Sequence, residues 1–429
     1  MRTKYEFDDY GARAIRGTIV HAPVYGELEV LPRGVITVNA LGIITGVYSE
    51  CQAKAKGIEH TIDLGDKLIL QAMCDMHLHA PQYPMMGLGT ELELLDWLRT
   101  YTYPIERKFF DLSVARDTSY ALAKELIQNG TTRICAFSSS DVDSTLELMR
   151  ILEAEGLHGY VGKVNMDRNC NSLVQETTEQ SITETQKWLI CCNRQNNIKP
   201  IITPRFTPAC TDTLMKELGV ITDMEGLRVQ SHLSENLDEI DWVTHLVPGT
   251  THYWQSYKQA GLWKNKTLMA HCVWSDDNET SAMQESGVYM VHCPTSNMNL
   301  ASGFAAAADK HRKHVKVVLG SDIGAGHTLN MFDVMASAIQ TSKHVEDLPE
   351  DRLTVAQAYY MATSAAQEWF DEEPGFCPGN AFHALVVDDS QLPNSSMLTP
   401  QARLERLLYK RQQDWLVAVF AKERCLYNI

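Results

Sequence analysis

The chain has 429 residues, of which 44% are hydrophobic and 21% are charged, a composition typical of a globular protein. Its 38 basic and 54 acidic residues leave a formal net charge of −16. This charge repels phosphate backbones and anionic lipids, and no run of Lys or Arg offsets it locally, so we expect no nucleic-acid partner and no membrane binding.

The cysteines and the first residues bear on the cellular compartment. Eleven cysteines occur without the spacing of a disulfide framework, and the segment MRTKYEFDDYGARAIRG lacks the apolar core of a signal peptide. No uninterrupted apolar run is long enough to span a bilayer. We therefore expect free thiols and a cytoplasmic location.

Both ends of the chain contain short β-like segments separated by turn residues. Residues 1–67 include RGTIVHAP and VITVNALGIITGVYSE, and residues 373–429 include HALVVDDS and ERLLYKR after the Gly/Pro-rich EEPGFCPGN. This pattern predicts one small β-sandwich assembled from the N- and C-terminal segments.

The middle of the chain, residues 68–372, alternates apolar, β-rich runs with amphipathic stretches such as DLSVARDTSYALAKELIQNG. Eight strands alternating with helices predict an α/β fold with a parallel sheet, and eight is the number that closes a (β/α)8 TIM barrel. Runs such as LMAH and YMVH suit strands covered on both faces, although a doubly wound open sheet would show the same alternation. The predicted strands are 68–77, 132–139, 158–166, 199–206, 227–233, 266–273, 288–293 and 315–321.

The segment DMHLH, at the end of the first predicted barrel strand, contains His77 and His79. Residues two apart in a strand point to the same side, so both imidazoles can reach one metal ion. With 15 His among 429 residues, chance yields roughly half an HxH pair per chain. The pair alone is therefore equally consistent with two ordinary surface or core histidines.

Further polar residues follow other predicted strands. His232, His271 and Asp322 lie at the ends of the fifth, sixth and eighth strands, and these ends meet at the face of a barrel where active sites are found. Four imidazoles and a carboxylate at one face predict a catalytic metal site rather than a polar cluster on a scaffold. Glu235 follows His232 in the same loop and could transfer a proton. Without His232 nearby, an ordinary solvated Glu would be the preferred interpretation.

The fourth strand ends in TPRF, where barrel hydrolases with two metals commonly carry a bridging Lys or carboxylate. Arg205 cannot ligate a cation, so we expect a mononuclear site. Neutral imidazoles with one carboxylate suit one Zn²⁺ per subunit, and iron would also be accommodated.

Several segments resemble the amidohydrolase superfamily, and within it the guanine deaminases: HLHAPQYPMMG, LLDWLRTYTYPIE, NGTTR, KPIITPRFTPAC, QSHLSEN, HCPTSN, LASGF and LGSDIGAG. The resemblance spans roughly residues 60 to 370. It implies hydrolytic deamination of guanine to xanthine and ammonia, a small-molecule purine as the binding partner, and a homodimer. Gln71-Ala72 stands where this superfamily usually has Pro-Gly, so we expect an altered start of the first barrel strand and an intact site.

The resemblance also implies roles for individual residues. The metal ligands would be His77, His79, His232 and Asp322. Glu235 would be the proton shuttle, and His271 and Asp322 would orient the attacking water. The purine would be held by Gln82, Arg205, Phe206, His232, Glu235 and Asp322. Without the resemblance, we would prefer a salt bridge for Arg205 and simple core packing for Phe206.

Three alternatives remain open. The same barrel could deaminate a related ring, such as 8-oxoguanine, cytosine or a pterin. The unrelated zinc deaminases use H-x-E with P-C-x-x-C; His344-Val345-Glu346 matches the first half, but the chain has no P-C-x-x-C. An inactive barrel that serves as a scaffold would be expected to have substituted ligands, and none is substituted here.

Overall fold

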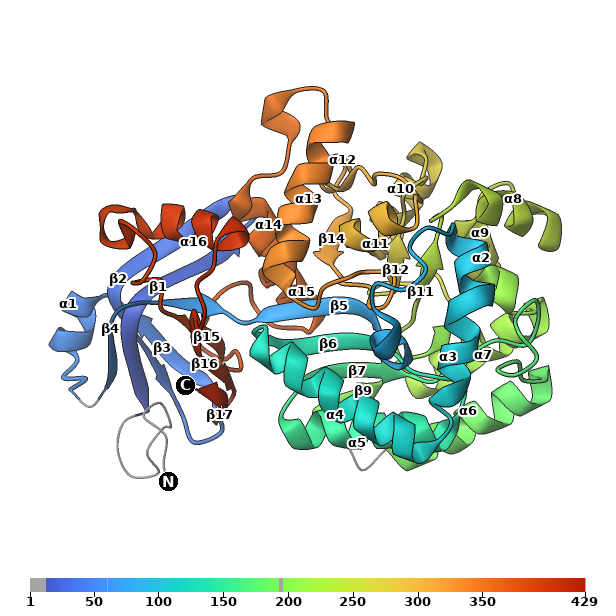
Figure 1. The fold of residues 1–429 in the computed structure, drawn as a ribbon, viewed down its shortest axis with the longest axis horizontal. Coiled ribbons are helices and arrows are strands. Elements are labelled where there is room, and N and C mark those ends of the chain that lie inside the picture. The colour runs from blue at the N-terminus through green and yellow to red at the C-terminus, as the bar shows by residue number, and fades with distance from the viewer. Residues whose placement is uncertain (1–12, 60, 193–195, 429) are drawn as a thin grey trace.

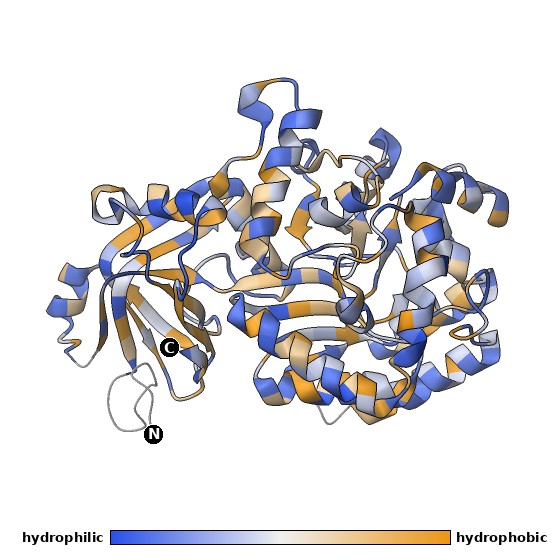
Figure 2. Cartoon of the chain, in the orientation of Figure 1, coloured by the Kyte–Doolittle hydropathy of each residue, from blue (hydrophilic) through white to orange (hydrophobic). Residues whose placement is uncertain are grey.

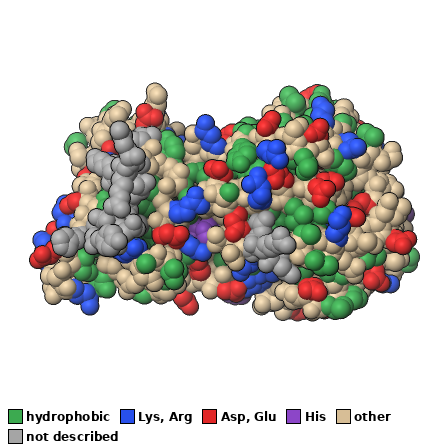
Figure 3. Space-filling model, turned by 90° about the horizontal axis from the view of Figure 1, so that it is seen from below, with side chains coloured by type: hydrophobic (Ala, Val, Ile, Leu, Met, Phe, Trp, Pro, Cys, Tyr) green, Lys and Arg blue, Asp and Glu red, His purple; other side chains and the backbone are tan. Residues whose placement is uncertain are grey.

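A computed structural model describes residues 13–59, 61–192 and 196–428 (Figure 1). In this view a β-sheet lies at the left and a barrel of strands and helices lies at the right. No helix in these three ranges combines the length and apolarity needed to cross a membrane. On the face shown in Figure 3, Lys and Arg side chains are interspersed with Asp and Glu.

In the part of the chain that the structure describes, the left-hand sheet has seven strands and is built from both ends of the chain. Its order is β17-β16-β15-β4-β1-β2-β3. The central strand β4 is parallel to β1 and antiparallel to β15, so the two chain ends meet along it. Its strands are β1 (Ala14–Val24), β2 (Glu27–Val38), β3 (Ile44–Tyr48), β4 (Ile62–Gln71), β15 (His383–Val387), β16 (Leu416–Ala421) and β17 (Arg424–Asn428). The division of the chain into segments 1–67, 68–372 and 373–429 stays a prediction.

The predicted strand ERLLYKR is wrong, because most of it belongs to helix α16 (Pro400–Tyr409). The Thr399 side chain accepts a hydrogen bond from the backbone N–H of Ala402 and so caps this helix. Leu404, Leu407 and Leu408 are buried along one face, at the spacing of a helix rather than a strand. A second short α-helix beside the sheet, α1, spans Glu50–Ala55.

Among the described residues the barrel contains eight parallel strands, and the predicted fold class is confirmed. Hydrogen-bonded pairing gives the orders β5-β6-β7-β9 and β11-β12-β13-β14. Ile202 pairs with Val229 at one junction. At the other, Asp322 N donates to His77 O and His79 N donates to Ile323 O, both at 2.8 Å, so the ring closes. The strands are β5 (Met73–His79), β6 (Thr131–Phe137), β7 (His158–Gly162), β9 (Ile198–Pro200), β11 (Gln230–Leu233), β12 (Leu268–His271), β13 (Tyr289–His292) and β14 (Lys316–Leu319), with β8 (Val164–Asn165) and β10 (Thr203–Pro204) extending the third and fourth.

Helices surround the barrel, and their ribbons alternate hydrophobic and hydrophilic residues, whereas the barrel strands are mostly hydrophobic (Figure 2). Their ends follow local capping rules: in α5 the Asp141 side chain accepts from Ser144 N, and Gly156 ends the helix at φ +94°. The α-helices are α2 (Leu94–Trp97), α3 (Tyr103–Lys108), α4 (Leu112–Gln128), α5 (Val142–Glu155), α6 (Thr178–Cys192), α7 (Asp212–Glu225), α8 (Leu237–Leu246), α9 (Trp254–Gln259), α10 (Asp277–Ser286), α11 (Pro294–Asn299), α12 (Ala307–Arg312), α13 (Met331–Val345), α14 (Val355–Ala362) and α15 (Ser364–Trp369). The 3-10 helices are η1 (Ala80–Met85), η3 (Thr207–Ala209), η4 (Pro349–Asp351) and η5 (Ser395–Met397), and η2 (Leu98–Thr102) is a π-helix.

The predicted first barrel strand, 68–77, is divided between β4 and β5. Gln71 ends β4 and is 2% exposed. Its Oε1 accepts from Ala22 N at 2.9 Å, and its Nε2 donates to Ser364 Oγ at 2.9 Å and Gln367 Oε1 at 2.7 Å. These bonds satisfy a buried amide at the passage from the sheet to the barrel.

Candidate active site

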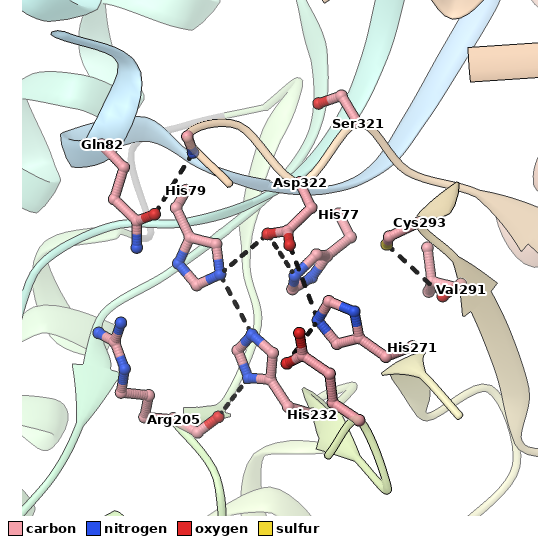
Figure 4. Close-up of polar contacts among 12 residues, drawn as sticks. His77, His79, Gln82, Arg205, His232, His271, Val291, Cys293, Ser321 and Asp322 are labelled. Carbon is pink, nitrogen blue, oxygen red and sulfur yellow. Dashed lines mark hydrogen bonds and ion pairs between the residues drawn. The ribbon is translucent and has the colours of Figure 1, made fainter. Parts of the chain in front are cut away.

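The carboxyl ends of the barrel strands bring the predicted metal and catalytic residues together (Figure 4). His77 and His79 end β5, His232 lies in β11 and His271 ends β12. Asp322 follows β14 in the segment that closes the ring against β5. All are buried except His232, which is partly exposed. The grouping expected for a barrel is therefore present.

The backbone turns sharply where two of these strands end. His271 has φ +74° and Asp322 has φ +50°, in the left-handed region that non-glycine residues rarely adopt. Such conformations cost about 1–3 kcal/mol each and persist where the surroundings hold them. At Asp322 the backbone N–H is held by His77 O, and Asp75 accepts from Ser321 N at 2.9 Å and from Ser321 Oγ.

The nitrogen and oxygen atoms of this cluster have the spacing of metal ligands. His79 Nε2 lies 3.1 Å from His232 Nε2, and Asp322 Oδ1 lies 3.2 Å from His77 Nε2 and 3.5 Å from His79 Nε2. Ligands at about 2.1 Å from a tetrahedral ion stand roughly 3.4 Å apart. The ligand atoms of His77, His79 and His232 all lie within 4.8 Å of one another, as do those of His77, His271 and Asp322.

The protonation state of the imidazoles also suits metal binding. His232 Nδ1 donates to Arg205 O at 2.5 Å, which leaves its Nε2 lone pair directed at the cluster (Figure 4). His77 Nε2 is buried and has no hydrogen-bond partner among the described residues. Burial lowers the pKa of His79 and of His232, so both are neutral. The chain thus has a histidine-rich candidate metal site.

Glu235 and His271 lie beside these ligands. His271 Nε2 is 3.4 Å from Glu235 Oε2 and 3.8 Å from Asp322 Oδ2. Burial raises the pKa of the Glu235 carboxyl group. A carboxyl group whose pKa is raised and which lies next to a ligand cluster is suited both to give and to take a proton.

Two residues that support this pair were missed by the sequence analysis. Asn297 Oδ1 accepts from His271 Nδ1 at 2.8 Å, and Ser302 Oγ donates to Glu235 Oε1 at 3.1 Å. Both lie in the segments HCPTSN and LASGF, which carried the resemblance without a role for these side chains. Their position in those segments was the signal that could have identified them.

A pocket opens beside the cluster, and the predicted purine-contacting residues line it: Gln82, Arg205, Phe206, His232, Glu235 and Asp322. Its apolar walls come from Leu94, Trp97, Leu98, Leu300 and Ala325. Apolar walls with a few polar groups suit a small heterocyclic ligand. The roles of the individual residues stay predictions.

The alternative interpretations of Arg205 and Phe206 also hold. Arg205 forms a buried ion pair with Glu106, which the sequence analysis did not single out. Phe206 is 5% exposed and belongs to an apolar cluster with Trp97, Leu98 and Leu300. Each side chain therefore packs in the protein and faces the pocket at the same time.

Comparison with known proteins assigns the family. The amidohydrolase family model matches residues 68–407. Guanine deaminase of Dictyostelium discoideum is 34% identical over 398 residues, covering 88% of each chain, and guanine deaminase of Rattus norvegicus is 35% identical over 393 residues, covering 88% of this chain and 86% of the relative. The crystal structure of guanine deaminase from C. acetobutylicum with bound guanine superposes with a TM-score of 0.92 at 38% identity, covering 97% of this chain and 100% of that chain. The chain therefore belongs to the amidohydrolase family.

Proposed function

We propose that this protein is a metal-dependent hydrolase that converts guanine and water to xanthine and ammonia. The observation that carries the proposal is the contact between the histidine-rich cluster and a pocket lined by Gln82, Arg205 and Phe206. Similarity to guanine deaminases over most of the chain, including a structure with bound guanine, supports the same substrate.

His77, His79, His232 and Asp322 would hold one Zn²⁺ per subunit. Neutral imidazole nitrogens and one carboxylate are ligands that zinc prefers, and iron is the alternative metal. The buried Nε2 of His77, which makes no hydrogen bond among the described residues and lies 3.2 Å from Asp322 Oδ1, supports this donor set. When bound, the ion would acidify the attacking water and so supply hydroxide at neutral pH.

The remaining steps belong to the side chains. His271 and Asp322 orient the water and take its proton, which the 3.8 Å separation of His271 Nε2 and Asp322 Oδ2 permits. Glu235 protonates a ring nitrogen of guanine while water attacks C2. The proton taken from the water then passes from His271 to Glu235, whose Oε2 lies 3.4 Å from His271 Nε2, and Glu235 delivers it to the amino group. The C2–N bond breaks and ammonia leaves, and the hydroxyl on C2 returns its proton to Glu235 as it becomes the carbonyl of xanthine. The neutral Glu235 carboxyl that this sequence needs is favoured by its burial.

Recognition of the base would come from the polar side chains and the apolar walls of the pocket. Gln82 and Arg205 carry hydrogen-bond donors that suit the C6 carbonyl and ring nitrogens of guanine. Phe206 would stack on the ring. We further propose a homodimer, because two-fold pairs are the commonest soluble assemblies, and light scattering of the purified protein tests it. The cytoplasmic location stays a prediction.

The test is to incubate the metal-replete protein with guanine and to follow xanthine and ammonia together. We expect equal amounts of the two products, loss of activity after chelation, and recovery on adding Zn²⁺. If the protein retained metal but left guanine unchanged, 8-oxoguanine, pterins and cytosine would be tested next. No product from any of them would favour the scaffold alternative.

A further inference from the structure

Glu106, in α3, lies behind the polar end of the pocket and contacts both of the side chains proposed to hold the base. Its carboxylate accepts from Arg205 Nη1 at 2.9 and 2.8 Å and from Gln82 Nε2 at 2.8 Å. Glu106 is 2% exposed, Arg205 is 3% exposed and Gln82 is 1% exposed. One buried carboxylate therefore joins two residues that are 123 positions apart and that share the pocket.

The carboxylate determines which atoms of Gln82 are available. An ionised carboxylate only accepts hydrogen bonds, so the Gln82 amide must direct Nε2 toward Glu106. Its Oε1 then accepts from Gly324 N at 3.3 Å, and rotation of the amide would place donors against donors at Gly324 (Figure 4). Gln82 is thereby left with one unused N–H, a donor, for a ligand.

The same carboxylate orients Arg205. Within the described part of the chain, the hydrogen bonds of this guanidinium use Nη1 and go to Glu106. Nη2 and Nε stay available, and both are donors. The guanidinium also lies over the Tyr103 ring, 5.2 Å from its centroid, which restricts its plane. The buried charge of Arg205 is balanced by Glu106, so this end of the pocket suits a neutral ligand.

We propose that Glu106 is a positioning residue that makes the recognition edge of the pocket a donor-only edge. Such an edge accepts a purine with a carbonyl at C6 and rejects one with an amino group there, because the amino group would face fixed donors. The proposal rests on guanine deamination as the function, and it adds the residue that sets the discrimination at C6.

The probe is 2,6-diaminopurine, which keeps the C2 amino group of guanine and replaces the C6 carbonyl by an amino group. For the unaltered protein we expect kcat/KM for guanine to exceed that for 2,6-diaminopurine by on the order of 10³-fold or more. In Glu106→Gln the new amide can donate as well as accept, so Gln82 can rotate. We expect the ratio to fall at least about tenfold.

Two variants separate positioning from general damage. Glu106→Asp keeps an acceptor-only group, so we expect lower kcat/KM for both bases with the ratio preserved. Asp389→Asn alters another buried carboxylate, which follows β15 and is paired with Arg403 of α16, and we expect an unchanged ratio. An unchanged ratio in Glu106→Gln, or an equal fall in Asp389→Asn, would overturn the proposal.

Glu106→Gln leaves Arg205 buried without a counter-charge, which can prevent folding. In that case the double variant Glu106→Gln, Arg205→Gln removes both charges, and we expect it to fold and to show the same loss of discrimination. A double variant with the original ratio would contradict the role of Glu106. Failure of guanine deamination itself is recognised separately, because the unaltered protein would then be inactive with metal bound.

Discussion

Replacing Glu235 should stop the proton transfer and leave the metal bound, because Glu235, unlike the neighbouring Asp322, is not a proposed metal ligand. Its carboxylate is not among the proposed metal ligands and lies 3.4 Å from His271 Nε2. Glu235→Gln should therefore retain the metal but lower kcat about 10²- to 10⁴-fold, because the amide cannot carry the proton. Metal content by elemental analysis and steady-state kinetics measure the two quantities. Near-normal turnover in the variant would show that another group moves the proton.

The sequence predicts the position of some site residues but not of others, and the difference has a physical reason. His77, His79 and Asp322 lie where strands end, so a pattern of strands places them at one face. Glu106 is 24 positions from Gln82 and 99 from Arg205, in a short helix that no strand pattern locates. Its contacts arise only when the segment after β5 packs over the barrel.

Strand β7 begins where the barrel meets the sheet, and a histidine is partly buried at this contact. His158, its first residue, packs edge-on against His383 of β15, with ring centroids 4.9 Å apart. Burial, together with the nearby charges of Lys422, Arg133 and Arg424, lowers the pKa of His158 to about 3. The imidazole is therefore neutral in the folded protein throughout the mildly acidic range.

This neutral imidazole predicts a loss of stability in acid. Below pH 6.5 the unfolded chain binds a proton at His158 that the folded protein does not, so stability falls as the pH drops from about 6.5 toward about 3. Between pH 7 and pH 5 the loss is up to about 2 kcal/mol. Denaturant unfolding of the protein and of His158→Gln at both pH values measures it. The variant should lose less stability over this range, and an equal loss would contradict the assignment.

Most helices and strands could be predicted from the sequence. Where the observed elements differ from the predicted ones, the cause is local. The predicted strand 199–206 is interrupted, since Pro200 and Pro204 lack the N–H that would continue a ladder. The run 68–77 is apolar throughout, so nothing in its pattern marks the change from β4 to β5 near Gln71. In the C-terminal segment, the spacing of Leu404, Leu407 and Leu408 fits a helix better than a strand.

At the scale of the whole molecule, the last 50 residues complete a sheet that the first 70 begin. Removing residues 381–429 would take away β15, β16 and β17 and leave one edge of β4 unpaired, with Leu68 and Leu70 uncovered. We expect this truncated chain to aggregate, because an exposed apolar edge pairs with other chains. Sedimentation analysis measures the aggregates.

A shorter truncation is the matched control. Removing residues 424–429 deletes only the edge strand β17, which pairs with β16 alone. We expect this protein to stay dispersed, with a modest fall in melting temperature. If the larger truncation stayed dispersed as well, the pairing of β4 with β15 would contribute little to the integrity of the molecule.

The pairing of β4 with β15 also has a consequence for biosynthesis. Gln71 is partnered with Ala384, so about 310 residues must be translated before the open side of β4 can be covered. At roughly 5–20 residues per second this takes about 15 to 60 s, long enough for the intervening barrel segments to emerge and begin folding. Throughout that interval the nascent chain displays an unfinished sheet, which makes it a client for chaperones that bind near the ribosome.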